Sequence, residues 1–206
     1  MATSCAGGLL AVKRVKDSTQ AKERKLIDSN KEKIKAIAEM QKTTGTWYAW
    51  GKKEYMEQWV KAPSIMEHAL SIKGGDQSPQ GAGLYLASQA WRSSTYANDE
   101  ARLLIAILTA VPTIDIRNKE QQTALSKTGL DFEALYEASN LVEMLLIYSQ
   151  AATYGRLTAI TGVRLTTDLK QVSAATLKAD YKKFGSAAKG VFALQAKESG
   201  LDITGW

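Results

Sequence analysis

Two tyrosines flank a predicted strand-to-helix corner near the middle of the chain. Tyr85 lies in the segment Leu84–Ala87, whose alternating side chains predict a short strand. Tyr96 follows in a polar segment that reads as the start of a helix. Such a corner can bring both rings to one side of a cleft, where they would clasp a flat, electron-poor ring by stacking. The alternative is that both tyrosines only pack in the core.

Metal chemistry and the familiar nucleophile–histidine arrangements find little support in the residue types. The chain contains one cysteine, Cys5, and one histidine, His68. One thiol excludes an intramolecular disulfide, and the pair is too few for a zinc-type cluster, so we predict no metal site. His68 lies in a predicted helix without a nucleophile motif and is interpreted as structural or solvated. A lone cysteine is typical of a protein that works in a reducing compartment.

The composition is that of a soluble globular protein: 206 residues, of which 45% are hydrophobic and 23% charged. No apolar run approaches the length needed to cross a bilayer, so we expect no membrane partner. The apolar stretch within the first ten residues is short and lacks a basic segment before it, which argues against a secretory signal peptide.

The positive charge of the chain is concentrated near its N-terminus. The formal net charge is +6, and residues 13–42 hold ten basic and five acidic side chains, so the remainder is nearly neutral. A nucleic-acid-binding module is one interpretation of this basic segment and of the five tryptophans. We disfavour it because acidic residues are interleaved with the basic ones and no base-reading motif is present.

Strands and helices are predicted in mixed order, which is typical of an α+β domain. We expect a flexible N-terminus over residues 1–17, a charged helical extension over 18–42 and one domain over 43–206. The Gly-rich and Pro-containing segment 73–83 is predicted to be a loop, either a lid or acceptor-recognition element or a plain connector. The other predicted elements are strands at 46–50, 84–87, 111–117, 141–148 and 156–165, helices at 55–61, 63–72, from 131 onward and over most of 173–199, and a strand or buried helix at 99–110.

With these elements in place, the segment Gly83-Leu84-Tyr85-Leu86-Ala87, followed by Ser93 and Tyr96, resembles the second signature of ADP-ribosyltransferases of the diphtheria-toxin and poly(ADP-ribose)-polymerase type. The resemblance covers about residues 46–166. It implies a split mixed β-sheet core, here with a helical N-terminal extension and a helical C-terminal tail, and NAD as the substrate. It also implies that Tyr85 and Tyr96 stack on the nicotinamide while the Ser93 hydroxyl donates to its carboxamide.

The third signature of that family is a glutamate at the start of a late strand, and the segment 141–152 resembles it. The resemblance then makes Glu143 the catalytic carboxylate, which orients the ribose hydroxyls and offsets the positive charge of an oxocarbenium-like transition state. The alternative is that residues 132–146 form a helix, which would leave Glu143 on the surface.

The first signature is where this sequence departs from the family. Its comparable strand ends with Trp50-Gly51, and Trp50 stands where members usually carry histidine. The Gly51 backbone would still reach the carboxamide because no side chain obstructs the approach. With Trp50 in place of histidine, the residue that would bind the adenine-side ribose is not identified, and elongation of ADP-ribose chains is not expected.

The resemblance implies an NAD-dependent mono-ADP-ribosyltransferase, acting as a monomeric bacterial effector or toxin in the cytoplasm or in a host cytosol. Leu141 stands where arginine-modifying relatives carry an acidic or amide residue, which favours a hydroxyl acceptor such as Thr or Ser. The expected partner is a host protein. Ubiquitin is one candidate, but no residue of the sequence points to it specifically. The alternatives are an NAD glycohydrolase on the same fold and a scaffold that has lost its activity.

Overall fold

The computed structural model describes residue 25 and residues 28–72, 80–151 and 153–206. The predicted flexible N-terminus and most of the predicted loop at 73–83 lie outside the described residues. In chain order the elements are a helix over residues 28–39, β1 (Lys42–Lys52), α2 (Lys53–Lys61), α3 (Ile65–Ser71), β2 (Leu84–Ala87), the 3-10 helix η2 (Ala90–Tyr96), β3 (Ala101–Asp115), α4 (Lys119–Ser126), α5 (Phe132–Ser139), β4 (Leu145–Ile147), β5 (Tyr154–Leu157), β6 (Val163–Thr166), the 3-10 helix η3 (Leu169–Gln171), α6 (Ala174–Tyr181) and α7 (Ser186–Glu198).

Five strands form a closed mixed barrel. Their order is β1-β2-β5-β4-β3, and β3 pairs back with β1 to close the ring, while β6 adds to β3 from outside. The pairing of β3 with β4 is parallel, and the other described pairings are antiparallel. The predicted α+β class is therefore confirmed. The sequence did not indicate that the sheet closes on itself.

The alternation of side chains along the strands separates an inner from an outer face. Trp47 and Ala49 of β1 lie in one buried cluster with alternate residues of the other four barrel strands, which makes this cluster the barrel interior. Buried side chains of α2 and α3, among them Trp59 and Ile65, belong to the same cluster. Tyr48 and Trp50, the intervening residues of β1, face outward.

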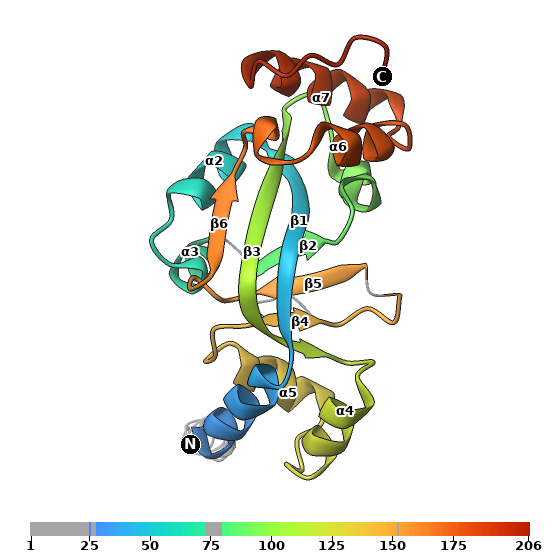
Figure 1. Cartoon of the computed structure of the whole chain (residues 1–206). Coiled ribbons are helices and arrows are strands. Elements are labelled where there is room, and N and C mark those ends of the chain that lie inside the picture. The colour runs from blue at the N-terminus through green and yellow to red at the C-terminus, as the bar shows by residue number, and fades with distance from the viewer. Residues whose placement is uncertain (1–24, 26–27, 73–79, 152) are drawn as a thin grey trace, which may run out of the picture.

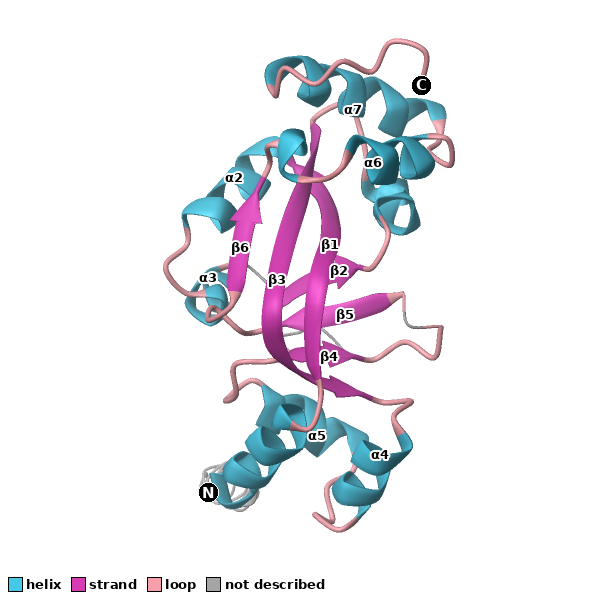
Figure 2. Cartoon of the chain, in the orientation of Figure 1, coloured by secondary structure: helices cyan, strands magenta, loops and turns pink. Residues whose placement is uncertain are grey.

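Helices cover the outer face at the two ends of the molecule (Figure 1). At one end α6 and α7 pack on β1 and β3 through a second cluster that includes Phe184 and Phe192. At the other end the helix over residues 28–39 and α5 pack on β4 and the end of β3 through a third cluster, which includes Ile34 and Leu135. Figure 2 shows β2 and β5 in the zone between these two groups of helices.

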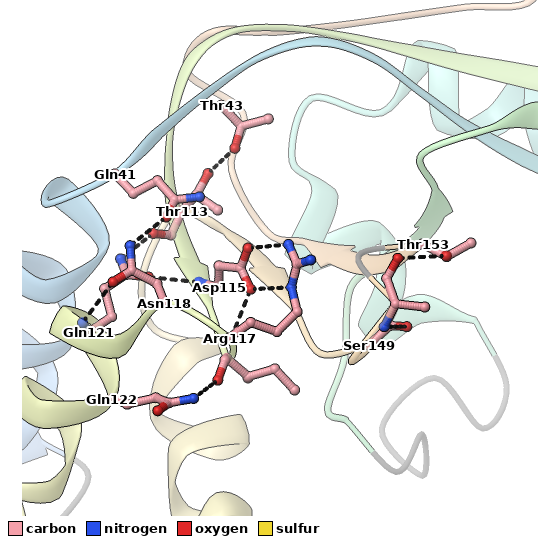
Figure 3. A network of polar contacts seen from close by, with 12 residues as sticks. Gln41, Thr43, Thr113, Asp115, Arg117, Asn118, Gln121, Gln122, Ser149 and Thr153 are labelled. Carbon is pink, nitrogen blue, oxygen red and sulfur yellow. Dashed lines mark hydrogen bonds and ion pairs between the residues drawn. The ribbon is translucent and has the colours of Figure 1, made fainter.

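Two buried glutamines bond the main chain of β3 near its two ends. Gln121 of α4 accepts from the Asp115 N–H at 2.8 Å and donates to the Thr113 carbonyl at 2.7 Å (Figure 3). Gln195 of α7 accepts from the Leu103 N–H at 2.9 Å and donates to the Leu103 carbonyl at 2.8 Å. Each amide supplies the bonds that a neighbouring strand would otherwise make, because at Leu103 β3 extends beyond β6 and at Thr113 and Asp115 it extends beyond its pairing with β1.

Several element predictions are corrected by the structure. The segments 99–110 and 111–117 form one strand, β3, because a bulge at Ala110 (φ 51°) sets two residues opposite Thr44 and lets pairing with β1 continue. The predicted strand at 156–165 is instead β5 and β6, separated by a turn in which Gly162 has a positive φ of 74°. The predicted strand at 141–148 is a strand only over β4, and α4 was not predicted.

The predicted charged extension is integrated into the fold where the structure describes it. Ile34, Ile37 and Ala38 of its helix are buried in the third cluster, and β1 begins at Lys42. Within the described part of the chain, no helix combines the length and the apolar character needed to span a membrane.

Candidate functional site

A cavity of about 300 Å³ lies at the outward-facing side of β2 and β5. Its walls carry five aromatic side chains and one serine, with aliphatic residues of β1 and β2 completing the lining. We call it the aromatic pocket; the six side chains are Trp50, Tyr85, Ser93, Tyr96, Tyr148 and Tyr154. Four of these residues were predicted as site residues from the sequence, and the fold brings those four together.

The strand-to-helix corner forms largely as the sequence predicts, with a 3-10 helix in place of the expected α-helix. Two buried contacts fix the start of η2. The Trp50 indole N–H donates to the Ala90 carbonyl at 2.9 Å, and the Ala90 N–H donates to Asp180 of α6 at 2.8 Å. Burial raises the pKa of Asp180, and the bond from Ala90 and the charge of Lys183 oppose that rise. Trp50 and Asp180 thus position the helix that carries Ser93 and Tyr96.

Tyr85 is held in one orientation by its neighbours. Its hydroxyl donates to the Gly81 carbonyl at 2.6 Å, and its ring lies edge-on to Tyr148 with 6.1 Å between ring centroids. Gly81 has a positive φ of 84°, which suits glycine in the tight segment before β2. A fixed ring that needs no reorganisation is a suitable wall for a stacked ligand.

Tyr148 and Tyr154 line the aromatic pocket and were missed by the sequence interpretation. Tyr148 follows β4 directly, and Tyr154 opens β5, opposite Ala87. The Tyr154 hydroxyl donates to the Arg92 carbonyl at 3.0 Å, which ties β5 to η2. Burial, with smaller effects from the surrounding tyrosines, raises the pKa of Tyr148 to about 12, so its hydroxyl stays neutral at physiological pH.

Ser93 differs from the other residues of the pocket because its hydroxyl is buried and unpaired. The residue is 8% exposed, and no partner for its Oγ lies among the described residues. An unsatisfied buried hydroxyl is uncommon and costs stability unless something bonds to it. Tyr96, three residues later, is 72% exposed and lies at the rim of the same cavity. The pocket therefore offers aromatic surfaces and an open rim, with the unpaired Ser93 hydroxyl buried in its wall.

Glu143 lies apart from this arrangement. Its Oε2 accepts from the Thr161 N–H at 3.2 Å, and it lines a different cavity of about 470 Å³ beside Lys31 and Lys35 of the first helix. The expected convergence of this carboxylate with the tyrosines is not found. The physical reason is that β4 begins only at Leu145, so Glu143 belongs to the irregular segment before the strand. Its catalytic role stays a prediction.

Gly51 is also outside the lining of the aromatic pocket. It pairs with Arg102 in the ladder between β1 and β3. A Cβ at this position would lie 2.6 Å from the methyl carbon of Met56 in α2, so that flexible side chain would have to move to admit any other residue. Its predicted contact with a carboxamide stays a prediction.

The remaining chemistry-bearing groups form structural contacts. His68 packs edge-on against Trp59 with 4.4 Å between ring centroids. Asp115 forms a bidentate pair with Arg117, at 2.9 and 2.6 Å, close to where β3 pairs with β4 (Figure 3). No group of three or more His, Cys, Asp or Glu residues able to hold a metal ion occurs in the described ranges.

Comparison of the chain with protein-family models, with curated proteins and with solved structures found no match. The function is therefore inferred from the geometry of the chain's own residues.

Proposed function

We propose that the protein is an ADP-ribosyltransferase-like NAD-binding protein whose aromatic pocket receives the nicotinamide ring. The observation that carries the proposal is the convergence of Tyr85, Ser93 and Tyr96 on one cavity, in the spacing of the second signature of that family. The strand-to-helix corner that carries these residues is β2 followed by η2. The sheet closes into a five-strand barrel, whereas the resemblance implies a split sheet, so the proposal rests on the corner and not on the sheet.

The chemistry of the pocket fits an oxidised nicotinamide. The ring carries a positive charge, and the faces of Tyr and Trp attract cations, with about 0.5–2 kcal/mol gained per contact. Among the residues that the structure describes, no charged side chain lines the pocket. The carboxamide requires a hydrogen-bonding partner, and the buried Ser93 Oγ can supply one. A volume of about 300 Å³ suits a ring rather than a whole dinucleotide.

Transfer of ADP-ribose to a protein is the reaction we propose for this site, with a Thr or Ser hydroxyl as the acceptor. Cleavage of the nicotinamide–ribose bond needs a negative group near the ribose as positive charge develops. Glu143 fulfils this role only if its segment reaches the bound ribose, since it lines another cavity. The neutral lining specifically favours a second candidate, NAD binding without turnover.

Calorimetric titration with NAD tests the binding proposal. Tyr85→Ala removes a stacking wall, so NAD affinity should fall about tenfold, which corresponds to ~1.4 kcal/mol. Tyr55→Ala is the matched control, because Tyr55 is a half-exposed tyrosine of α2 outside the pocket. ADP-ribose, which lacks nicotinamide, should respond equally to both substitutions. Equal NAD affinities for the two variants would refute the pocket assignment.

Incubation with labelled NAD and cell lysate tests the reaction. Label attached to protein supports transfer, free ADP-ribose alone supports hydrolysis, and intact NAD supports binding without turnover. If Glu143 acts on the ribose, Glu143→Gln should lower the rate about 100-fold while NAD affinity stays the same. A Glu143→Gln variant as active as the wild type would exclude this carboxylate from the chemistry.

A further inference from the structure

Two cations share one indole beside the aromatic pocket. The Arg92 guanidinium carbon lies 3.9 Å from the centroid of the Trp91 ring, and the Lys183 ammonium lies 5.1 Å from it. We call these two side chains the Trp91 cation pair. A cation above an aromatic face is held in place without being neutralised, so its N–H groups remain available to an anion.

The Trp91 cation pair has no matching carboxylate contact. Neither Arg92 nor Lys183 forms an ion pair among the described residues, and both side chains are exposed. The acidic group closest along α6 is Asp180, which is buried and bonds to the Ala90 N–H. The charge of Lys183 also acts on the Asp180 carboxylate, which offsets part of it, and the net positive field of the two exposed cations at the surface would attract a polyanionic group.

The Trp91 cation pair is connected to the aromatic pocket through main-chain contacts. Arg92 precedes Ser93, whose side chain lines the pocket, and the Arg92 carbonyl accepts from the Tyr154 hydroxyl at 3.0 Å. Lys183 lies two residues after the end of α6, and Asp180 of that helix holds the start of η2. Arg92 thus lies on the same short element as Ser93 and Tyr96 of the pocket, and α6, which precedes Lys183, holds the start of that element.

We propose that Arg92 and Lys183 form the subsite for the diphosphate of the dinucleotide whose nicotinamide ring lies in the aromatic pocket. This inference rests on the proposed function. The pocket has room for the ring alone, so the ribose and the two phosphates must lie outside it. Arginine and lysine are the side chains that bind phosphate oxygens most strongly. Here Arg92 directly precedes Ser93, the residue that would bond the carboxamide, and Lys183 lies over the same indole as Arg92.

The test compares NAD with nicotinamide riboside, which carries the same ring and ribose but no phosphate. Arg92→Gln should lower NAD affinity about tenfold in calorimetric titration and leave riboside affinity unchanged. Lys183→Gln should act in the same direction. Lys61→Gln, the loss of one exposed charge at the end of α2, serves as the control and should affect neither ligand. Added salt should weaken NAD binding in the wild type more than in the Arg92→Gln variant.

Other outcomes separate this inference from the function on which it rests. If NAD and the riboside bind to the wild type and Arg92→Gln affects them equally, the diphosphate subsite is refuted while the nicotinamide pocket stands. If neither ligand binds to the wild type, both proposals fail. If Arg92→Gln weakens binding of a single-stranded oligonucleotide but not of NAD, the cations belong to a nucleic-acid surface and the inference is overturned. Near-ultraviolet circular dichroism establishes that each variant is folded.

Discussion

The buried hydroxyl of Ser93 separates a binding role from a packing role at the scale of a single residue. An unpaired buried hydroxyl costs about 1–3 kcal/mol in the folded state, and a ligand that accepts its bond regains that free energy. We therefore expect Ser93→Ala to leave the free energy of unfolding unchanged or higher, and to lower NAD affinity about threefold to tenfold. Thermal unfolding and titration of the same samples provide the two measurements.

The neighbouring serine supplies the control. The Ser94 hydroxyl donates to the Trp91 carbonyl at 2.7 Å, so Ser94→Ala removes a satisfied bond and should lower stability slightly without changing affinity. A Ser93→Ala variant that is less stable but binds NAD as well as the wild type would show that the hydroxyl only fills space.

Local spacing predicts only the part of the pocket that one stretch of chain builds. Tyr85, Ser93 and Tyr96 lie on one strand and on the helix that follows it, so their relative positions can be predicted from their spacing in the sequence. Tyr154 reaches the pocket because β5 pairs with β2, with Tyr154 opposite Ala87. That register depends on long-range pairing, which the sequence alone does not show. Glu143 was assigned to a strand that in fact starts two residues later.

At the scale of elements, the prediction concerns the glutamine that bonds β3. Gln195 bonds the buried N–H and carbonyl of Leu103 and also donates to the Thr167 carbonyl at 2.7 Å. Gln195→Leu fills the same space but leaves those groups unpaired, so we expect a loss of about 2–4 kcal/mol in the free energy of unfolding. Urea denaturation measures the change.

An exposed amide offers the comparison for this substitution. The exposed Gln171 side chain donates to Asp168, the one partner it has among the described residues, and Gln171→Leu should change stability by less than about 0.5 kcal/mol. If Gln195→Leu changes the free energy of unfolding as little as Gln171→Leu does, the hydrogen bonds of the Gln195 amide to the β3 backbone are not needed for stability.

The sequence predicted the elements with strong local signals and missed those that depend on tertiary contacts. The alternation in β2 and the Ser64 side chain that caps α3 are local, and both elements were predicted. In β3, residues 99–110 and 111–117 were predicted as two separate elements, but pairing with β1 on both sides of the bulge at Ala110 keeps the strand continuous. The cap of α4 by Asn118 was present in the sequence and was overlooked.

At the scale of the whole molecule, one arginine joins parts that are distant in sequence. Arg156 of β5 is fully buried and bonds to the Ala82 carbonyl before β2, and to Ser139 and Asn140 at the end of α5. The C-terminal end of a helix carries partial negative charge, which compensates the guanidinium in place of a carboxylate. Burial lowers the pKa of Arg156 to about 10, which reflects the cost of holding this charge in the interior.

Arg156→Lys tests whether the hydrogen bonds of Arg156 hold the barrel and α5 together. A lysine keeps the charge but cannot reach all of the acceptors with one ammonium group, so we expect a loss of about 2–4 kcal/mol in the free energy of unfolding. Because α5 and the segment before β2 would then separate from the barrel more easily, the urea transition should also broaden, with a lower m-value. Arg164→Lys, at an exposed position of β6, should alter neither quantity. A sharp wild-type-like transition for Arg156→Lys would mean that apolar packing alone couples the helical end to the barrel.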